Sequence, residues 1–294
     1  MHRKIVSIFI SFALMIVSLG FSITRVSAQR GPVKTDTRIS YHNGPVMTGT
    51  SAIYLIWYGN WTGNTAQSIL TDLASNIGSS PYFLINTTYP DLSGGAPSGG
   101  LIYAGAVYDS YSQGPSLSVA NVKQIVAAQL SSGHLPLDTA GIYLVIGSSD
   151  VTDIRPDGTT FCTPGAQPHH GLGEFSGTLF KYGYIGGAAR CPTIAGPQLF
   201  GLTPPNDNFS ADAMASTMAH LLSVIVTSPS GPGAPYGGWY DRYGLENADK
   251  CAGQFGTTYA ASNGGPANIR LGARDYLIQQ NWVNARKGYC ALSY

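Results

Sequence analysis

The sequence contains few charged side chains. Only 11% of its 294 residues are Asp, Glu, Lys or Arg, against roughly 25% in ordinary globular chains. Its 16 basic and 15 acidic residues nearly cancel, so the composition excludes the strongly basic class of nucleic-acid-binding proteins. Glycine (37 residues) and proline (18 residues) are abundant instead. This composition favours a loop-rich, secreted protein.

Two chemical signatures are also missing. No glycine-rich phosphate loop follows any predicted strand, so a nucleotide site is not indicated. No Cys-x-x-Cys spacing occurs, which argues against a four-cysteine zinc site. The four cysteines are Cys162, Cys191, Cys251 and Cys290. An even number in an exported chain predicts two disulfides, for which the sequence alone allows three connectivities.

The amino terminus predicts export. Arg3 and Lys4 precede an apolar run over residues 5–23, and small residues at 26–28 form a cleavage-like end that would leave Gln29 first. An uncleaved membrane anchor is the alternative, since the run approaches spanning length. Cleavage removes three basic residues and leaves 13 basic and 15 acidic ones, a net charge of −2. We therefore expect a signal peptide at 1–28 and one secreted domain at 29–294, with no later membrane span.

The first half of the chain alternates strand and helix patterns. Apolar runs and their periodicity predict a buried strand at 52–58, a helix at 65–77, a strand at 101–108 with a bulge at Gly105, a helix capped by Ser118, and a buried strand at 141–147. Such alternation predicts an α/β fold in which helices cover a mixed, mostly parallel sheet. Between 148 and 205 we expect an irregular, disulfide-tied second half with one strand at 179–185.

A long apolar helix and an acidic cluster follow. Helical spacing predicts a helix at 211–227, capped by Ser210 and carrying one imidazole, His220. The densest acids of the chain come after a glycine- and proline-rich loop and include Glu246 and Asp249. These acids could reach His220 and form a divalent-metal site. Alternatively, they accept backbone hydrogen bonds and His220 is a core histidine.

Several separated segments resemble the EXORDIUM or phosphate-induced protein 1 family of secreted proteins, most closely its bacterial-type branch. These segments are residues 41–47, 213–220, 238–241, 246–251, 268–272 and 276–284. Many family members carry His-Glu-x-x-Glu on the long helix, similar to the helix of zinc peptidases. The resemblance thus implies a zincin-like, three-layer fold with its site at His220.

The chain departs from that motif at two positions. Leu221 stands where the family has the glutamate that activates water, and Val224 stands where it has the second helical carboxylate. No catalytic residue is therefore predicted, and no cofactor is expected, although zinc held by His220, Glu246 and Asp249 is the alternative. The resemblance also aligns His170 with a family histidine. Since His169 and His170 are adjacent, only one of them can face that site from a regular strand.

The resemblance also suggests how the cysteines pair. Family members often have further cysteines near His169 and near Ala195, and this chain lacks both. Their joint absence implies that those two pair with each other, which leaves Cys162 with Cys191 and Cys251 with Cys290. Near the carboxyl end we expect a short strand pair or hairpin in which Trp282 packs against the core and Cys290 fastens the terminus.

Two functions follow from this comparison. The first is a secreted, catalytically degenerate protein that binds wall polymer or another protein outside the cell, in the extracellular space or cell wall. The second is a metal-dependent, peptidase-like hydrolase that uses His220 with Glu246 or Asp249, and with His170 in support. The missing glutamates favour the first function. The residues indicate neither the ligand nor the oligomeric state.

Overall fold

A five-stranded mixed sheet forms the centre of the molecule. The computed structural model describes residues 38–233 and 237–294, so the predicted signal peptide lies outside the described residues. The strands are β2 (Ser51–Tyr58), β3 (Leu101–Asp109), β5 (Gly141–Gly147), β7 (His169–Phe175) and β8 (Thr178–Ile185). Their order is β3-β2-β5-β8-β7, with parallel pairs throughout except for the antiparallel edge strand β7.

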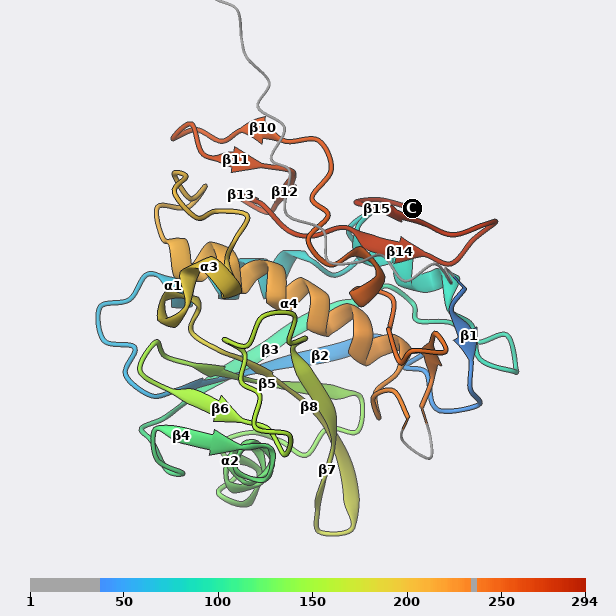
Figure 1. Cartoon of the computed structure of the whole chain (residues 1–294). Coiled ribbons are helices and arrows are strands. Elements are labelled where there is room, and N and C mark those ends of the chain that lie inside the picture. Colours follow the sequence, from blue (N-terminus) through green and yellow to red (C-terminus); the bar gives the residue numbers. More distant parts are fainter. Residues whose placement is uncertain (1–37, 234–236) are drawn as a thin grey trace, which may run out of the picture.

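Helices cover both faces of this sheet, as predicted for an α/β fold (Figure 1). On one face α1 (Ala66–Asn76) and α4 (Phe209–Thr227) pack against the side of β2 that carries Leu55. On the other face α2 (Val119–Ser131) packs against the side that carries Ile56. Because both faces are covered, β2 and β5 are apolar along nearly their whole length.

Two local predictions are confirmed. The register between β2 and β3 shifts at Gly105, where the chain adopts a φ of +146° that favours glycine. Ser118 caps α2, because its hydroxyl accepts a hydrogen bond from the Asn121 amide and the Asn121 side chain accepts one from the Ser118 amide.

The start of α4 differs from the prediction. The helix begins at Phe209, and its cap is Asn208, whose side chain accepts a hydrogen bond from the Ala211 amide. Ser210 lies inside the helix, and its hydroxyl accepts a hydrogen bond from the Ala189 amide instead. Both residues are good caps, so the sequence could not distinguish a helix that starts two residues earlier.

The expectation that no later segment could span a membrane was too strict. Among the described residues, α4 is the one helix whose length and composition would allow it to cross a membrane. However, 83% of its most apolar 18-residue window is buried inside the molecule. Its apolar character is therefore that of a core helix, which is apolar all round because it is enclosed all round.

The second half is more regular than predicted next to the sheet. Residues 169–175 form β7, the edge strand that pairs with β8, where we expected an irregular wall. Gly173 allows the Phe180 ring to pack on this strand, and it also weakens the strand pattern in the sequence. A side chain there would collide with the Phe180 ring, which lies over the backbone of β7, yet glycine itself has a low strand propensity.

Short elements and two disulfides complete the structure. They are β1 (Ser40–Tyr41), η1 (Phe83–Thr88), β4 (Ser116–Ser118), β6 (Thr152–Ile154), η2 (Ala188–Arg190), α3 (Pro192–Ala195), β9 (Trp239–Tyr240), η3 (Asp249–Cys251), β10 (Tyr259–Ala260), β11 (Pro266–Ala267), β12 (Ile269–Leu271), β13 (Arg274–Tyr276), β14 (Asn281–Val283) and β15 (Tyr289–Ala291).

The disulfides join Cys162 to Cys191 and Cys251 to Cys290, as the family resemblance implied. The predicted carboxyl-terminal hairpins are β12–β13 and β14–β15, and the second places Trp282 opposite Cys290.

Candidate functional site

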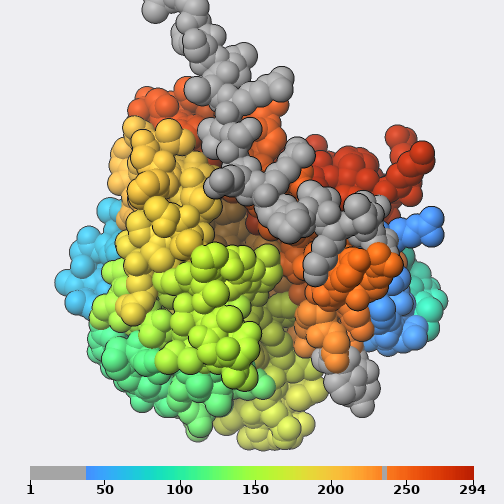
Figure 2. Space-filling view, viewed as in Figure 1, coloured from blue at the N-terminus to red at the C-terminus, as the bar shows by residue number. Residues whose placement is uncertain are grey.

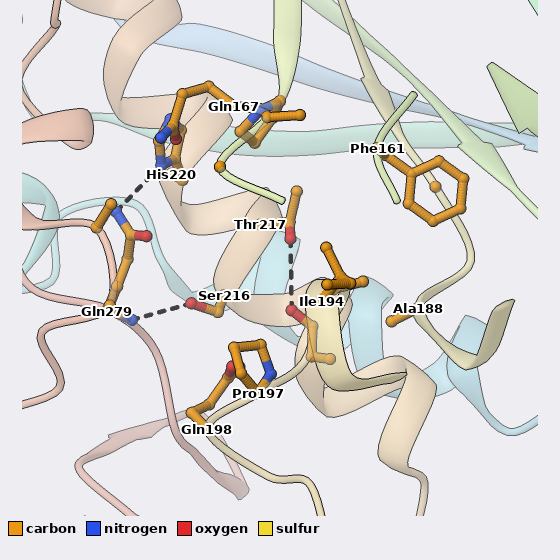
Figure 3. A pocket seen from close by; sticks show the side chains of 18 of the residues that line it. Phe161, Gln167, Ala188, Ile194, Pro197, Gln198, Ser216, Thr217, His220 and Gln279 are labelled. Atoms are coloured by element: carbon orange, nitrogen blue, oxygen red, sulfur yellow. Dashed lines mark hydrogen bonds between the residues drawn. The ribbon is translucent and has the colours of Figure 1, made fainter. Parts of the chain in front are cut away.

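The face of α4 turned away from the sheet forms the floor of a cavity. Ala213, Ser216, Thr217 and His220 recur at spacings of three and four residues, so they lie on one side of the helix. The space above them has a volume of about 220 Å³. Figure 2 shows the surface hollowed between the yellow segment that contains α3 and the orange to red carboxyl-terminal segment. His220 stands at one end of this cavity (Figure 3).

Two segments build the walls. One is the disulfide-tied stretch between β6 and α4, and the other is the carboxyl-terminal stretch after η3. Wall residues that carry polar or aromatic side chains are Arg155, Phe161, Gln167, Tyr184, Gln198, Phe255 and Gln279. The Cys162–Cys191 disulfide joins the two ends of the first wall. This disulfide-tied wall lies beside the long helix, as predicted, and lines one side of the cavity.

His220 is buried and held from two sides. The Gln279 side-chain Nε2 lies 3.1 Å from Nδ1 and donates to it, while its second N–H donates to the Ala248 carbonyl at 2.9 Å. On the other side, the His220 Nε2 lies 3.1 Å from Asp249 Oδ1. That approach lacks hydrogen-bond angles, so Asp249 Oδ1 has no hydrogen-bond partner. The ring orientation is thus set chiefly by Gln279.

Asp249 and Glu246 take different positions. Asp249 is the acid that reaches His220, and its other oxygen accepts a hydrogen bond from the Glu246 amide at 2.9 Å. Glu246 turns toward His170, whose Nε2 lies 3.6 Å from Glu246 Oε1. The sequence predicted that one of these acids reaches His220, and Asp249 does so. Glu246 instead faces the imidazole of His170.

The two adjacent histidines of β7 point in opposite directions, as expected for a strand. His170 Nε2 donates to the Ser228 carbonyl at 3.0 Å, just past the end of α4. His169 turns to the other face of the sheet, where it stacks on Tyr184 and lies 3.7 Å from Asp153. Only His170 joins His220, Glu246 and Asp249 in a cluster of four titratable side chains, which we call the inner cluster.

Burial governs the protonation of the inner cluster. It lowers the pKa of His170 to about 4, against smaller opposing effects of the Ser228 carbonyl and the Asp249 charge. It also raises the pKa of Glu246 well above its ordinary value, helped by the nearby charge of Asp249 and opposed by a hydrogen bond with Ser228. At neutral pH His170 is therefore uncharged, and the surroundings of Glu246 favour the neutral acid.

The inner cluster does not present a set of metal ligands. Across residues 38–233 and 237–294, no three His, Cys, Asp or Glu side chains are grouped so that they could hold one metal ion. The His170 Nε2 carries a proton donated to Ser228, and the His220 Nδ1 accepts one from Gln279. What remains unpaired is one oxygen each on Glu246 and Asp249.

Sequence reasoning missed the glutamines of the cavity. Gln167 and Gln198 lie on the first wall and Gln279 on the second, and Figure 3 shows all three around the same space. Gln279 carried a faint signal, because it is a polar residue directly after the apolar residues Leu277 and Ile278. Gln198 carried none, since a single glutamine in a loop has no periodicity from which burial could be inferred.

Comparisons with known proteins agree with the resemblance read from the sequence. The model of a family described as the phosphate-induced protein 1 conserved region matches residues 39–275. Protein EXORDIUM-like 5 of Arabidopsis thaliana is 29% identical over 246 residues, which cover 76% of this chain and 64% of that protein. Protein EXORDIUM-like 3 of Arabidopsis thaliana is 26% identical over 275 residues, which cover 81% of this chain and 78% of that protein. The match thus spans less than two thirds of EXORDIUM-like 5. No solved structure matches the chain.

Proposed function

The chain belongs to the phosphate-induced protein 1 family, and from this premise we propose that it is exported and acts outside the cell by binding wall polymer or another protein, without catalysis. Export is supported by the signal-like residues 1–28 and by the two disulfides, which form and persist in oxidising compartments. The carboxyl-terminal motifs at 268–272 and 276–284 support a place in the bacterial-type branch of the family.

One observation carries the non-catalytic proposal. Leu221 and Val224 occupy the helix positions of the family's two glutamates, and they are 0% and 1% exposed within the apolar core. Leu221 packs toward Gly183 on β8, where a methyl group of the leucine lies 3.3 Å from the place of a glycine Cβ. A general base beside His220 is therefore replaced on α4 by core packing, and hydrolysis of a peptide bond lacks the group that would deprotonate water.

We also propose that the fold is zincin-like. Three features support this assignment: the helices on both faces of a mixed sheet, the antiparallel edge strand β7, and a long buried helix that turns its one histidine toward a cavity. In this arrangement the site keeps a cavity but has no carboxylates at the two helix positions. A cavity without those groups is suited to binding rather than to hydrolysis.

A metal-dependent hydrolase that uses His220 with Glu246 or Asp249 is the second candidate function. The unpaired, buried oxygens of Glu246 and Asp249 favour it, because buried polar atoms ordinarily have partners. The arrangement as a whole does not fit zinc, however. Burial favours a protonated Glu246, and in the described part of the chain no group of three donors is formed. We therefore place this candidate below binding.

Expression of the full chain with its own amino terminus tests the proposed function. We expect the protein in the medium, beginning at Gln29, and we expect it to sediment with insoluble wall polymer while leaving polymer and peptide substrates uncleaved. Protein unfolded by reduction of both disulfides is the control for adhesion. Retention inside the cell, or chelator-sensitive cleavage of a peptide, would contradict the proposal.

A further inference from the structure

One amide side chain of the cavity makes no hydrogen bond to the described part of the protein. Gln198 is only 4% exposed, and its side chain makes no hydrogen bond to any residue in the described ranges. Gln198 lines the cavity above α4 (Figure 3). Neither of its amide atoms is both shielded from solvent and unpaired, so the amide reaches the open space of the cavity, where a ligand can replace water as its hydrogen-bond partner. Gln198 is therefore placed to bond something that enters the cavity.

Other uncharged groups around the same space keep free hydrogen-bonding capacity. Gln167 makes no side-chain hydrogen bond to a described residue. The Ser216 hydroxyl accepts a hydrogen bond from the backbone N–H of Gln279, which leaves its own proton to donate. The Thr217 hydroxyl donates to the Ala213 carbonyl, which leaves its lone pairs to accept. The cavity thus offers donors and acceptors side by side.

The rest of the lining is mostly small, apolar and nearly uncharged. Phe161 and Phe255 contribute aromatic rings, and Tyr184 contributes the edge of a ring that is 2% exposed. The one cationic side chain is Arg155, whose Nε already lies 3.4 Å from Asp153. A cavity built for an anion would gather several cations or backbone amides. This one combines aromatic rings with amides and hydroxyls, so it selects a neutral ligand with both an apolar and a polar face.

We propose that this cavity binds one neutral sugar unit of an extracellular polysaccharide, a proposal that deepens the proposed function and rests on it. Each sugar hydroxyl both donates and accepts, as does an amide side chain. The C–H face of a pyranose ring can pack on an aromatic ring. The volume of about 220 Å³ is below the roughly 300–1,000 Å³ of pockets for drug-sized ligands, so one terminal or protruding unit fits and a longer run does not.

The alternative occupant, a peptide, fits less well. Extended peptides are recognised mainly through their backbone groups at a free sheet edge. The polar groups here are side chains that converge on a small cavity above a helix, and none of the cavity-lining residues belongs to the edge strands β3 or β7. The neutral sugar is therefore the occupant that the lining favours.

Calorimetric titration of the exported protein tests this inference. The probes are neutral tetrasaccharides of β-1,4-glucose, β-1,4-xylose and β-1,4-N-acetylglucosamine, with tetragalacturonate as the anionic comparison and a neutral tetrapeptide as the peptide comparison. We expect at least one neutral sugar to bind and tetragalacturonate and the peptide not to bind. Gln198→Ala and Gln167→Ala should each weaken that binding about tenfold, the effect of one lost hydrogen bond.

Gln124→Ala is the matched control, because Gln124 is exposed on α2, which covers the other face of the sheet. It should leave the affinity unchanged. Gln167→Ala removes a half-buried loop side chain and serves as the second variant if Gln198→Ala fails to fold. Equal sugar affinity in wild type and both cavity variants would overturn the inference.

The outcomes separate the two proposals. If the protein sediments with wall polymer but no tetrasaccharide depends on Gln198 or Gln167, the sugar cavity is wrong and the proposed function stands. Tighter binding of the peptide or of tetragalacturonate than of the neutral sugars would likewise overturn the sugar assignment alone. If the protein retains no polymer and cleaves peptides in a chelator-sensitive way, the proposed function fails, and the inference that rests on it fails too.

Discussion

At the scale of single residues, the site separates into a part that the sequence indicates and a part that only the fold supplies. Asp249 meets His220 because the segment that contains η3 returns to α4 at His220. The sequence could indicate that encounter through the family's motifs. It could not show that Glu246 faces His170 or that Gln279 bonds the imidazole, because both depend on the relative placement of β7 and the carboxyl-terminal stretch.

Asp212 gives a pH-dependent prediction at this scale. In the first turn of α4, burial raises its pKa to about 6 from an ordinary 3.8, against opposing hydrogen bonds from Asn206. Between these values the folded state keeps a proton that the unfolded state releases. The free energy of unfolding therefore falls as pH rises from about 4 to about 6, by up to roughly 3 kcal/mol, and this contribution is constant above that range.

Urea unfolding at pH 4, 5, 6 and 7 checks this dependence. Asp212→Asn removes this titration. The stability of the variant relative to wild type should therefore rise between about pH 4 and pH 6, where wild type loses stability, and then level off. Glu174→Gln, at an exposed position on β7, controls for the loss of one negative charge. A stability difference between Asp212→Asn and wild type that does not change with pH would show that Asp212 is ionised throughout.

At the scale of elements, α4 is the structural centre of the site as well as its floor. Leu222 is 0% exposed in the core that α4 shares with α1 and the sheet. Leu222→Ala should lower the free energy of unfolding by roughly 2–5 kcal/mol, because the lost packing leaves a cavity. Leu179→Ala on β8 is the matched control, since Leu179 is 52% exposed, and it should change stability by no more than about 0.5 kcal/mol. Similar losses for both variants would contradict the buried placement of α4.

The two disulfides allow a second comparison between elements. They close loops of similar length, with sequence separations of 29 and 39 residues. Each loop closure should contribute about 3–5 kcal/mol through the unfolded chain. Cys251 is also fully buried against Tyr89 and Trp282, whereas Cys162 and Cys191 are half-exposed. Replacing Cys251 and Cys290 by Ala should therefore cost more than replacing Cys162 and Cys191. The opposite ranking in thermal unfolding would show that the β14–β15 hairpin adds little.

The elements also show where sequence reasoning ends. Strands β2 and β5 could be predicted because continuous burial leaves an apolar run, and α4 because its apolar residues recur at helical spacing. The strand β7 could not, because two of its seven residues are glycine and one of them is needed for the Phe180 ring. The cap of α4 could not be fixed, because Asn208 and Ser210 suit that role equally well.

At the scale of the whole molecule, the sheet is built from both halves of the chain. β5 lies between β2 from the first half and β8 from the second, so a cut near Ser148 would leave the first half without β8. We predict that residues 29–294 fold as one domain, and that limited proteolysis yields no stable fragment ending near Ser148. Mass spectrometry of the digest checks this, and a protected fragment of that length with native-like circular dichroism would contradict it.

The central claim is that the site above α4 has kept its cavity and lost its metal chemistry. The measurement that tests it most directly is the zinc content of the purified, exported protein, determined by mass spectrometry of the metal after dialysis against zinc-containing buffer. The account predicts far less than one zinc per chain, unchanged in His220→Ala. One zinc per chain, lost in His220→Ala and in Asp249→Ala, would contradict it and make the hydrolase the better reading of this site.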